Sequence, residues 1–191
     1  MKKPRLMIYV QNLLGIGHLR RAAGISRAAV ERGFDVRFVS GGFPIKDLNI
    51  GEARFYQVPP VRSLDGDFKT LVAENNKEID DLWRNRRRKL LLDLFEKIRP
   101  QILLTELFPF GRRQFRFELI PLLTKAKEAK CCSKVVCSMR DILVTKPRHD
   151  RNLEIVETLE NFYQKILVHG DRKVISCLLY TSDAADDTPC V

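Results

Sequence analysis

The sequence predicts an α/β fold with a Rossmann-like, doubly wound parallel sheet. Short apolar runs rich in β-branched residues recur along the chain, segments with helical periodicity lie between them, and glycine or proline marks most junctions. Strands that alternate with helices assemble as right-handed βαβ units, and such units build a parallel sheet.

The first unit shows this pattern most clearly. Residues 6–10 form an apolar run typical of a buried strand, and Gly15 and Gly17 interrupt the chain after it. Apolar and small residues then recur at helical spacing over residues 18–32, and Gly33 provides the stop. A strand, a glycine turn and a helix are therefore expected in that order.

The same elements recur downstream. Further strands are expected over residues 35–40, 54–58, 101–105, 134–138 and 165–169. Helices are expected over residues 79–98, from Gly111 onward with a kink or break at Pro121, and over residues 152–164. A polar loop is expected to run to about Ala73. Together these elements predict one domain of residues 1–176.

Composition narrows the class of protein. The 191 residues are 45% hydrophobic and 30% charged, which is typical of a globular domain. No apolar run approaches the roughly 20 residues of a membrane-spanning helix, and residues 1–9 carry no cleavage site, so a cytoplasmic protein is expected. Cys131, Cys132 and Cys137 lack a fourth ligand at zinc spacing, so reduced thiols and no metal site are expected.

The end of the chain has a different character. Residues 177–187 resemble the translation of a sequencing-library adapter, and we expect residues 177–191 to be a foreign tail that makes few native contacts. This tail carries three aspartates and no basic residue. The net charge of +10 for the whole chain therefore becomes +13 for residues 1–176.

The positive charge fits three partner classes, which are phosphate-bearing small molecules, an anionic membrane surface and nucleic acid. The basic run at residues 84–89 is interpreted as a solvated helix face. Basic and aromatic residues interleave over residues 105–117, where packing of the phenylalanines in the core is favoured over stacking on nucleic acid.

Ligands of open parallel sheets bind at the carboxyl ends of the strands. His18 is the sharpest candidate there, because it opens a helix directly after two glycines and its imidazole could accept a proton near neutral pH. A histidine that merely begins a helix is the alternative. Glu106 and Asp141 follow other strand ends, and we expect them in the same crevice, where they would orient an acceptor or anchor arginines.

Arginines near these turns predict an anionic ligand. Arg20 and Arg21 lie in the first helical turn, where a cation opposes the helix dipole unless an anion or an acidic side chain offsets it. Solvated surface arginines are the alternative. Arg112 is one of three arginines at the entrance of a later helix, with Glu106 as a candidate partner. Arg21 and Arg112 are therefore predicted to bind substrate.

The glycine turn does not fit a dinucleotide site. Arg20 occupies the third glycine position of that fingerprint, and the second strand ends in Ser40 in place of the acidic residue that binds a ribose hydroxyl. No nicotinamide cofactor is expected.

Segments of the chain carry a resemblance to a known enzyme group. Residues 15–21 match the Gly-x-Gly-His-x-x-Arg signature of GT-B nucleotide-sugar enzymes. Together with residues 104–117 and 138–143, they resemble bacterial predicted glycosyltransferases of the family 28 group, and the resemblance covers nearly all of residues 1–176. Relatives in this group include the transferase that adds N-acetylglucosamine to the undecaprenyl cell-wall precursor and the UDP-sugar hydrolase of pseudaminic acid synthesis.

The resemblance implies the amino-terminal, acceptor-side domain of a two-domain GT-B fold, with the donor-binding, carboxyl-terminal domain missing. It assigns His18 as general base or phosphate ligand, and it places Gly15 and Gly17 in the loop beside the donor diphosphate. No metal or other cofactor is implied. The segment 108–111 differs from the second glycine-rich loop of the cell-wall enzyme, which argues against a lipid-linked acceptor.

We therefore expect the parent protein to transfer a sugar from a nucleoside diphosphate sugar to a hydroxyl acceptor. The missing domain would supply most donor contacts, so the 191-residue chain should fold without turning over a nucleotide sugar. Peripheral contact with the inner face of the membrane stays open. The alternatives are a nucleotide-sugar hydrolase and a non-catalytic basic module that binds membrane or nucleic acid through residues 84–89 and 112–116, although no nucleic acid is expected as partner.

Overall fold

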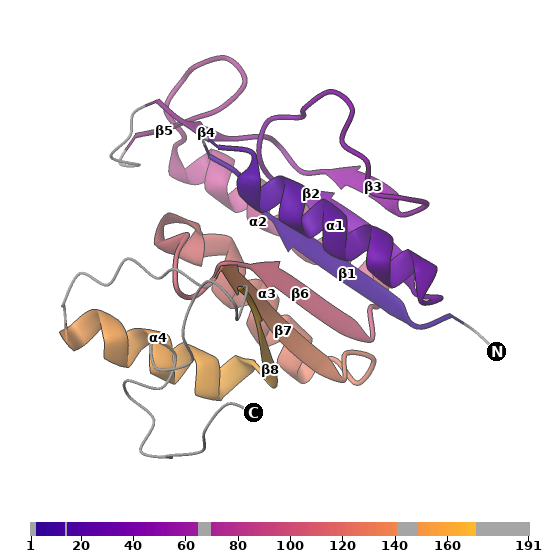
Figure 1. The fold of residues 1–191 in the computed structure, drawn as a ribbon. Coiled ribbons are helices and arrows are strands. Elements are labelled where there is room, and N and C mark those ends of the chain that lie inside the picture. The colour runs from indigo at the N-terminus through magenta and orange to yellow at the C-terminus, as the bar shows by residue number, and fades with distance from the viewer. Residues whose placement is uncertain (1–2, 14, 65–69, 141–148, 171–191) are drawn as a thin grey trace.

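The computed structural model describes residues 3–13, 15–64, 70–140 and 149–170, with residues 149 and 150 described by their backbone alone. Its centre is a six-stranded parallel sheet (Figure 1). The sheet strands are β1 (Arg5–Val10), β2 (Asp35–Ser40), β3 (Arg54–Gln57), β6 (Ile102–Glu106), β7 (Lys134–Arg140) and β8 (Lys165–His169). The helices are α1 (Gly17–Glu31), α2 (Asp81–Ile98), α3 (Arg116–Glu128), preceded by the short 3-10 helix η1 (Arg113–Phe115), and α4 (His149–Phe162).

The strand order confirms the predicted fold class. The strands lie in the order β3-β2-β1-β6-β7-β8, so the chain builds outward from β1 in one direction and then crosses over to continue from β6 in the other. This is the doubly wound order of a Rossmann-like sheet. The direction reverses between β1 and β6, which are paired in parallel with Tyr9 opposite Thr105.

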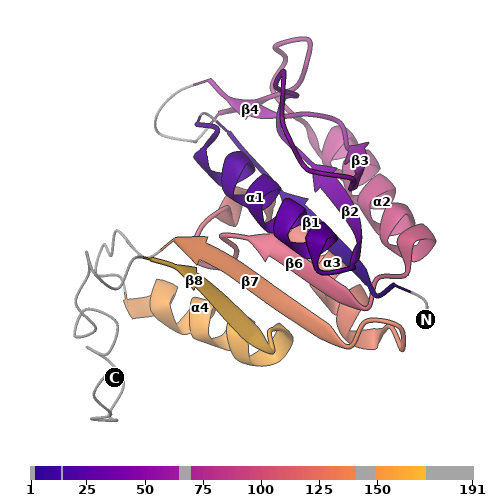
Figure 2. The same cartoon turned by 45° about the vertical axis from the view of Figure 1, so that its right-hand side comes forward.

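Alternating side chains of the strands divide the core into two layers. Met7 and Tyr9 of β1 pack with α2 and α3, whereas Ile8 and Val10 pack with α1. The sheet therefore lies between α1 on one face and α2 and α3 on the other (Figures 1 and 2). Within the described residues, no helix combines the length and apolar character needed to cross a bilayer.

One local prediction was wrong, and of the two alternatives predicted at Pro121, a kink or a break, the break does not occur. The segment that was expected to be a polar loop up to Ala73 contains the antiparallel pair β4 (Arg62–Ser63) and β5 (Leu71–Val72). Pro121 does not break α3, which runs as one helix from Arg116 to Glu128. Proline removes a single backbone donor there, and buried residues on both sides of it, Leu119 and Leu122, keep both halves of the helix packed on the core.

The basic run at residues 84–89 is a solvated face with one exception. Arg86 and Lys89 are exposed, but Arg87 is completely buried. Its guanidinium forms a salt bridge with the equally buried Glu118 of α3, with Nε 2.8 Å from Oε2. A buried cation requires such a partner because removal from water costs several kcal/mol per ion.

Further contacts of Arg87 join several elements. Its Nη2 donates to the Tyr9 hydroxyl at 2.8 Å and to Gln11 Oε1 at 2.5 Å, and its Nη1 donates to the carbonyl oxygens of Gly41 and Pro59. Burial lowers the pKa of Arg87, but the charge of Glu118 together with the contacts to Glu118 and Tyr9 outweighs it, and the net result is a raised pKa. The interpretation of the run as entirely solvated is therefore wrong at Arg87.

Candidate active site

The sequence-predicted residues His18 and Glu106 meet where the strand order reverses. His18 lies in the first turn of α1, directly after the loop that leaves β1, and Glu106 is the last residue of β6. Nδ1 of His18 lies 2.9 Å from Oε1 of Glu106. The Glu106 side chain is fully buried, whereas the His18 side chain retains 21% of its accessible surface. A buried carboxylate thus orients a solvent-accessible imidazole.

Arg21 also binds the Glu106 carboxylate. Its Nη1 donates to the same Glu106 oxygen at 3.0 Å, one helical turn from His18. The acidic partner expected for a cation at this helix terminus is therefore Glu106. Arg20, by contrast, is exposed and has no ion-pair partner among the described residues.

The donors around Glu106 determine which nitrogen of His18 is free. An ionised carboxylate carries no proton, so Nδ1 of His18 must donate to it. In a neutral imidazole Nε2 then keeps an unshared lone pair. No residue in the described part of the chain forms a hydrogen bond with Nε2. This is the tautomer that a general base needs.

The fold itself does not require glycine at positions 15 and 17, just before His18. A Cβ added to Gly15 or to Gly17 would meet no atom within 4 Å, and neither residue has a positive φ. Gly41 differs, because its Cβ would lie 2.2 Å from Gln11 Oε1 and 2.4 Å from Arg87 Nη2. Packing thus requires glycine at position 41 but leaves the space beside Gly15 and Gly17 open, as a closely approaching ligand would need.

The start of α1 offers backbone donors next to this space. Its N-cap, Ile16, makes no side-chain cap, and the first turn contains no acidic residue. The first helical bond runs from Arg20 N to Ile16 O. The N–H groups of residues 17–19 therefore have no intrahelical acceptor, and such groups with the helix dipole favour an anion.

Arg112 lies in the same crevice, between β6 and α3. Its Nε donates to the carbonyl oxygen of Gln11, just after β1, at 2.7 Å. Burial lowers the pKa of Arg112, and the charge of Glu106 partly opposes this effect. The other two guanidinium nitrogens have no partner among the described residues. Arg112 is thus fixed by one hydrogen bond with donors to spare.

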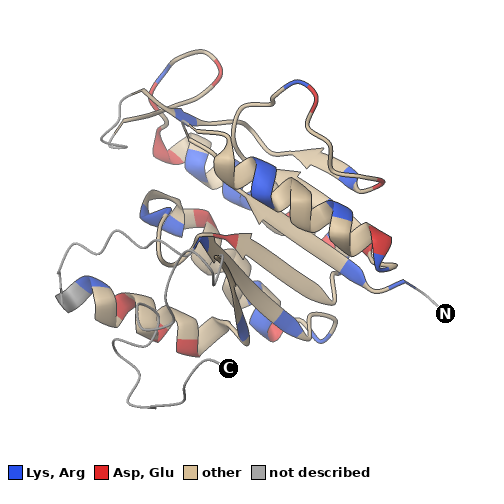
Figure 3. Cartoon of the chain, viewed as in Figure 1, with Lys and Arg blue, Asp and Glu red and all other residues tan. Residues whose placement is uncertain are grey.

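The neighbouring arginines are engaged elsewhere. Arg113 and Arg116 both form ion pairs with Glu154 of α4. In Figure 3, acidic segments lie among the basic ones on several elements. The sequence suggested more free positive charge near residues 112–116 than the structure presents.

Phe108 and Phe115 are buried, in agreement with the core interpretation.

Two residues that were not among the predicted catalytic and substrate-binding residues also join the site, although His169 was expected at the same rim of the sheet. Ser138 of β7 donates from Oγ to Oε2 of Glu106 at 2.5 Å, and its Oγ lies 3.0 Å from Nε2 of His169, the last residue of β8. Both lie at or near the carboxyl ends of their strands, so position alone could have indicated them, but the link from His169 through Ser138 to Glu106 depends on the order of β6, β7 and β8. Asp141 lies outside the described residues.

The thiol of Cys137, near Glu106, is not suited to nucleophilic chemistry. Cys137 points from β7 into the core, and burial, with the charge of Glu106, raises the pKa of its thiol to about 12. Such a thiol stays protonated at neutral pH and is a poor nucleophile. Among the residues described, no group of three His, Cys, Asp or Glu side chains could hold a metal ion.

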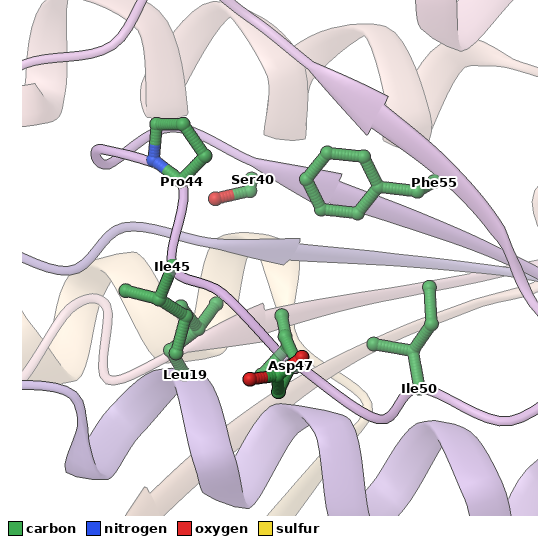
Figure 4. Close-up of a pocket in the computed structure, with 8 residues that line it drawn as sticks. Leu19, Ser40, Pro44, Ile45, Asp47, Ile50 and Phe55 are labelled. Carbon is green, nitrogen blue, oxygen red and sulfur yellow. The ribbon is translucent and has the colours of Figure 1, made fainter.

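A separate cavity of about 350 Å³ lies on another side of α1 (Figure 4). Its lining consists of Leu19, Ser40, Pro44, Ile45, Asp47, Leu48, Ile50 and Phe55. The β2–β3 connection, which contains no helix, covers the sheet here. Leu19 faces this cavity, whereas His18 is turned by about 100° around the helix toward β6. None of the described residues that were predicted to be catalytic or to bind substrate lines this cavity.

The protonation of His169 predicts a pH dependence of stability. Burial lowers the pKa of His169, with Glu106 opposing and Arg21 reinforcing the shift. The unfolded chain therefore takes up this proton at higher pH than the folded one, so the free energy of unfolding should fall as pH drops below about 6.5. Urea denaturation at several pH values should show a smaller loss for His169→Gln than for the wild type. Equal slopes for both proteins would contradict the assignment.

Comparison with known proteins places the fold among glycosyltransferases. No family model and no curated protein matches the sequence. Phytolacca americana UGT2, solved with UDP-2fluoro-glucose and pterostilbene, superposes with a TM-score of 0.54 at 14% identity, over 98% of this chain and 52% of its own. The calicheamicin glycosyltransferase CalG4 gives a TM-score of 0.45 at 12% identity, over 84% of this chain and 43% of its own.

This chain therefore spans about half the length of the solved structures it resembles, or less. At such low identity the likeness concerns the fold. The six-stranded, Rossmann-like sheet of this protein matches a domain of a GT-B glycosyltransferase.

Proposed function

We propose that residues 1–176 form the acceptor-side domain of a glycosyltransferase of the family 28 group, which transfers a sugar from a nucleoside diphosphate sugar to a hydroxyl acceptor. The observation that carries the proposal is the His18–Glu106 pair, in which a buried carboxylate holds Nδ1 and leaves Nε2 free at the reversal point of the sheet. A donor-binding domain in the second half of the parent protein would complete the site.

The proposed step assigns a task to each group. Nε2 of His18 accepts the proton of the acceptor hydroxyl while its oxygen bonds to the anomeric carbon and the bond from that carbon to the diphosphate breaks. Glu106 stabilises the imidazolium that forms. The start of α1 and the spare donors of Arg112 are placed to stabilise the leaving diphosphate, because donors aimed at developing charge lower the barrier.

The test is nucleotide release by the parent enzyme from UDP-, GDP- and TDP-sugars, measured with and without candidate hydroxyl acceptors. Release that depends on an acceptor and is matched by glycosylated product supports transfer. Equal release without any acceptor would identify a hydrolase in which water replaces the acceptor. An absence of release with every donor, for a protein that folds, would refute both activities.

Substitution of Gly17 tests whether this glycine is needed for ligand binding or for the fold. In Gly17→Ala the added Cβ meets no atom of the fold and lies at a helical position, so stability should be unchanged or slightly higher. Turnover by the parent enzyme should fall about 10- to 100-fold, because the methyl group displaces the ligand from its close approach.

Gly24→Ala is the matched control. It lies on the same helix, its Cβ makes only an ordinary contact at 3.9 Å with Arg27, and it should leave turnover unchanged. Normal turnover in Gly17→Ala would show that no ligand approaches this residue closely.

A further inference from the structure

A continuous hydrogen-bonded chain crosses three strand ends of the sheet and ends on His18. It runs from His169 of β8 to Ser138 of β7, with 3.0 Å between Nε2 and Oγ, and from Ser138 to Glu106 of β6 over 2.5 Å. From Glu106 it continues over 2.9 Å to His18 Nδ1. Ser138 and Glu106 are both buried.

The number of available protons determines which group donates in each of these hydrogen bonds. Ser138 has a single hydroxyl proton, and it donates that proton to Oε2 of Glu106. The Ser138 oxygen can then only accept from His169, so Nε2 of His169 must carry a proton. On the other side, Oε1 of Glu106 accepts from His18 Nδ1 and from Arg21, which is always a donor.

Every hydrogen bond in this series thus donates toward the Glu106 carboxylate. Donation from Ser138 disperses the negative charge of Glu106 and weakens the pull of its other oxygen on the His18 proton. A hydroxyl that itself accepts a hydrogen bond is a stronger donor, so His169 enhances the effect of Ser138.

We propose that His169 is a positioning residue that acts through Ser138 and Glu106 to orient His18 and to lower its proton affinity. The structure thereby extends the site from the His18–Glu106 pair to a four-residue relay. Its consequence for sugar transfer rests on the proposed function, whereas the relay itself is a property of this chain.

The surroundings allow a hydrogen-bond effect to be separated from a charge effect. Among the described residues, the charged or titratable groups near Glu106, apart from His18 itself, are Arg21 on α1, Arg112 after β6, Cys137 on β7 and His169 on β8. Burial lowers the pKa of His169, which favours its neutral form around neutral pH. Substitution of His169 there removes a donor and little charge.

The experiment is nitrogen NMR of the histidine rings in the purified 191-residue chain, which contains only three histidines. Ring nitrogen shifts distinguish the two neutral tautomers and follow titration. Above the titration range we expect His18 protonated on Nδ1 and His169 protonated on Nε2. In Ser138→Ala the titration of His18 should move to higher pH, with a proton affinity raised on the order of threefold.

Two substitutions of His169 provide a matched pair. His169→Leu removes the donor and should shift the His18 titration in the same direction by less, whereas His169→Gln keeps an amide donor at the place of Nε2 and should stay near the wild type. This pair also tests the relay if Ser138→Ala does not fold. A structural role alone would affect both variants of His169 alike.

The proposal is overturned if His169 carries its proton on Nδ1, or if the His18 titration is the same in the wild type and His169→Leu. These results do not depend on catalysis. A parent enzyme without transferase activity, combined with the expected tautomers and shifts, would refute the proposed function and leave the relay intact. Transferase activity combined with a His169 protonated on Nδ1 would refute the relay and leave the proposed function intact.

Discussion

Replacement of His18 by Ala in the parent enzyme is expected to lower turnover by about 100-fold or more, because the acceptor proton then has no side-chain base. His18 retains part of its surface, and among the described residues its ring forms a hydrogen bond only with Glu106, so the domain should still fold. Steady-state kinetics with saturating donor and acceptor should show the loss mainly in kcat, since the role concerns the transition state.

Glu31→Ala is a suitable control for this experiment. Glu31 is an exposed residue at the far end of the same helix and has no ion pair among the described residues, so its replacement should leave turnover unchanged. Near-normal kcat for His18→Ala would remove the base assignment. The same loss in Glu31→Ala would point to a general effect on α1.

Replacement of Arg87 by Met is expected to lower the free energy of unfolding by about 3–5 kcal/mol, because it leaves Glu118 as an unpaired buried charge. The carbonyl oxygens of Gly41 and Pro59 and the side chain of Gln11 lose their donor as well. Urea denaturation of the 191-residue chain measures this change without any need for activity.

The double variant Arg87→Met/Glu118→Gln should recover a large part of the lost stability, because it removes the uncompensated charge along with its partner. Arg86→Met is the control, since Arg86 is the exposed neighbour in the same run and its loss should change stability by less than about 0.5 kcal/mol. If Arg87→Met is no more destabilising than Arg86→Met, the salt bridge does not stabilise the fold.

The elements of the sheet were largely predictable because they follow from local periodicity. The strands at residues 35–40 and 165–169 were predicted with the boundaries that β2 and β8 have, and the helix expected from residue 18 is α1, which begins at Gly17. The prediction failed where packing overrides local preference. Pro121 stays within α3 because the helix is held by its buried residues, and β4 and β5 form in a segment whose composition indicated a loop.

The sequence by itself determined which residues could carry chemistry. Gly15, Gly17 and His18 follow a strand and open a helix, and Glu106 ends another strand, so the rule for parallel sheets selected them without coordinates. The tertiary structure decided which of these groups are partners. Glu106 pairs with His18 and Arg21, whereas the predicted arginines after β6 pair with Glu154 or bind Gln11.

Only the tertiary structure could distinguish Arg87 from the other basic residues of its run, since all of them look alike in a solvated helix face. What separates Arg87 is a carboxylate on another helix, Glu118, together with the glycine at position 41 that leaves room for its guanidinium. Ser138 and His169 likewise acquire a role only because β6, β7 and β8 are neighbours in the sheet. Periodicity acts between residues close in sequence, but a buried charge finds its partner through contacts that the strand order and helix packing create.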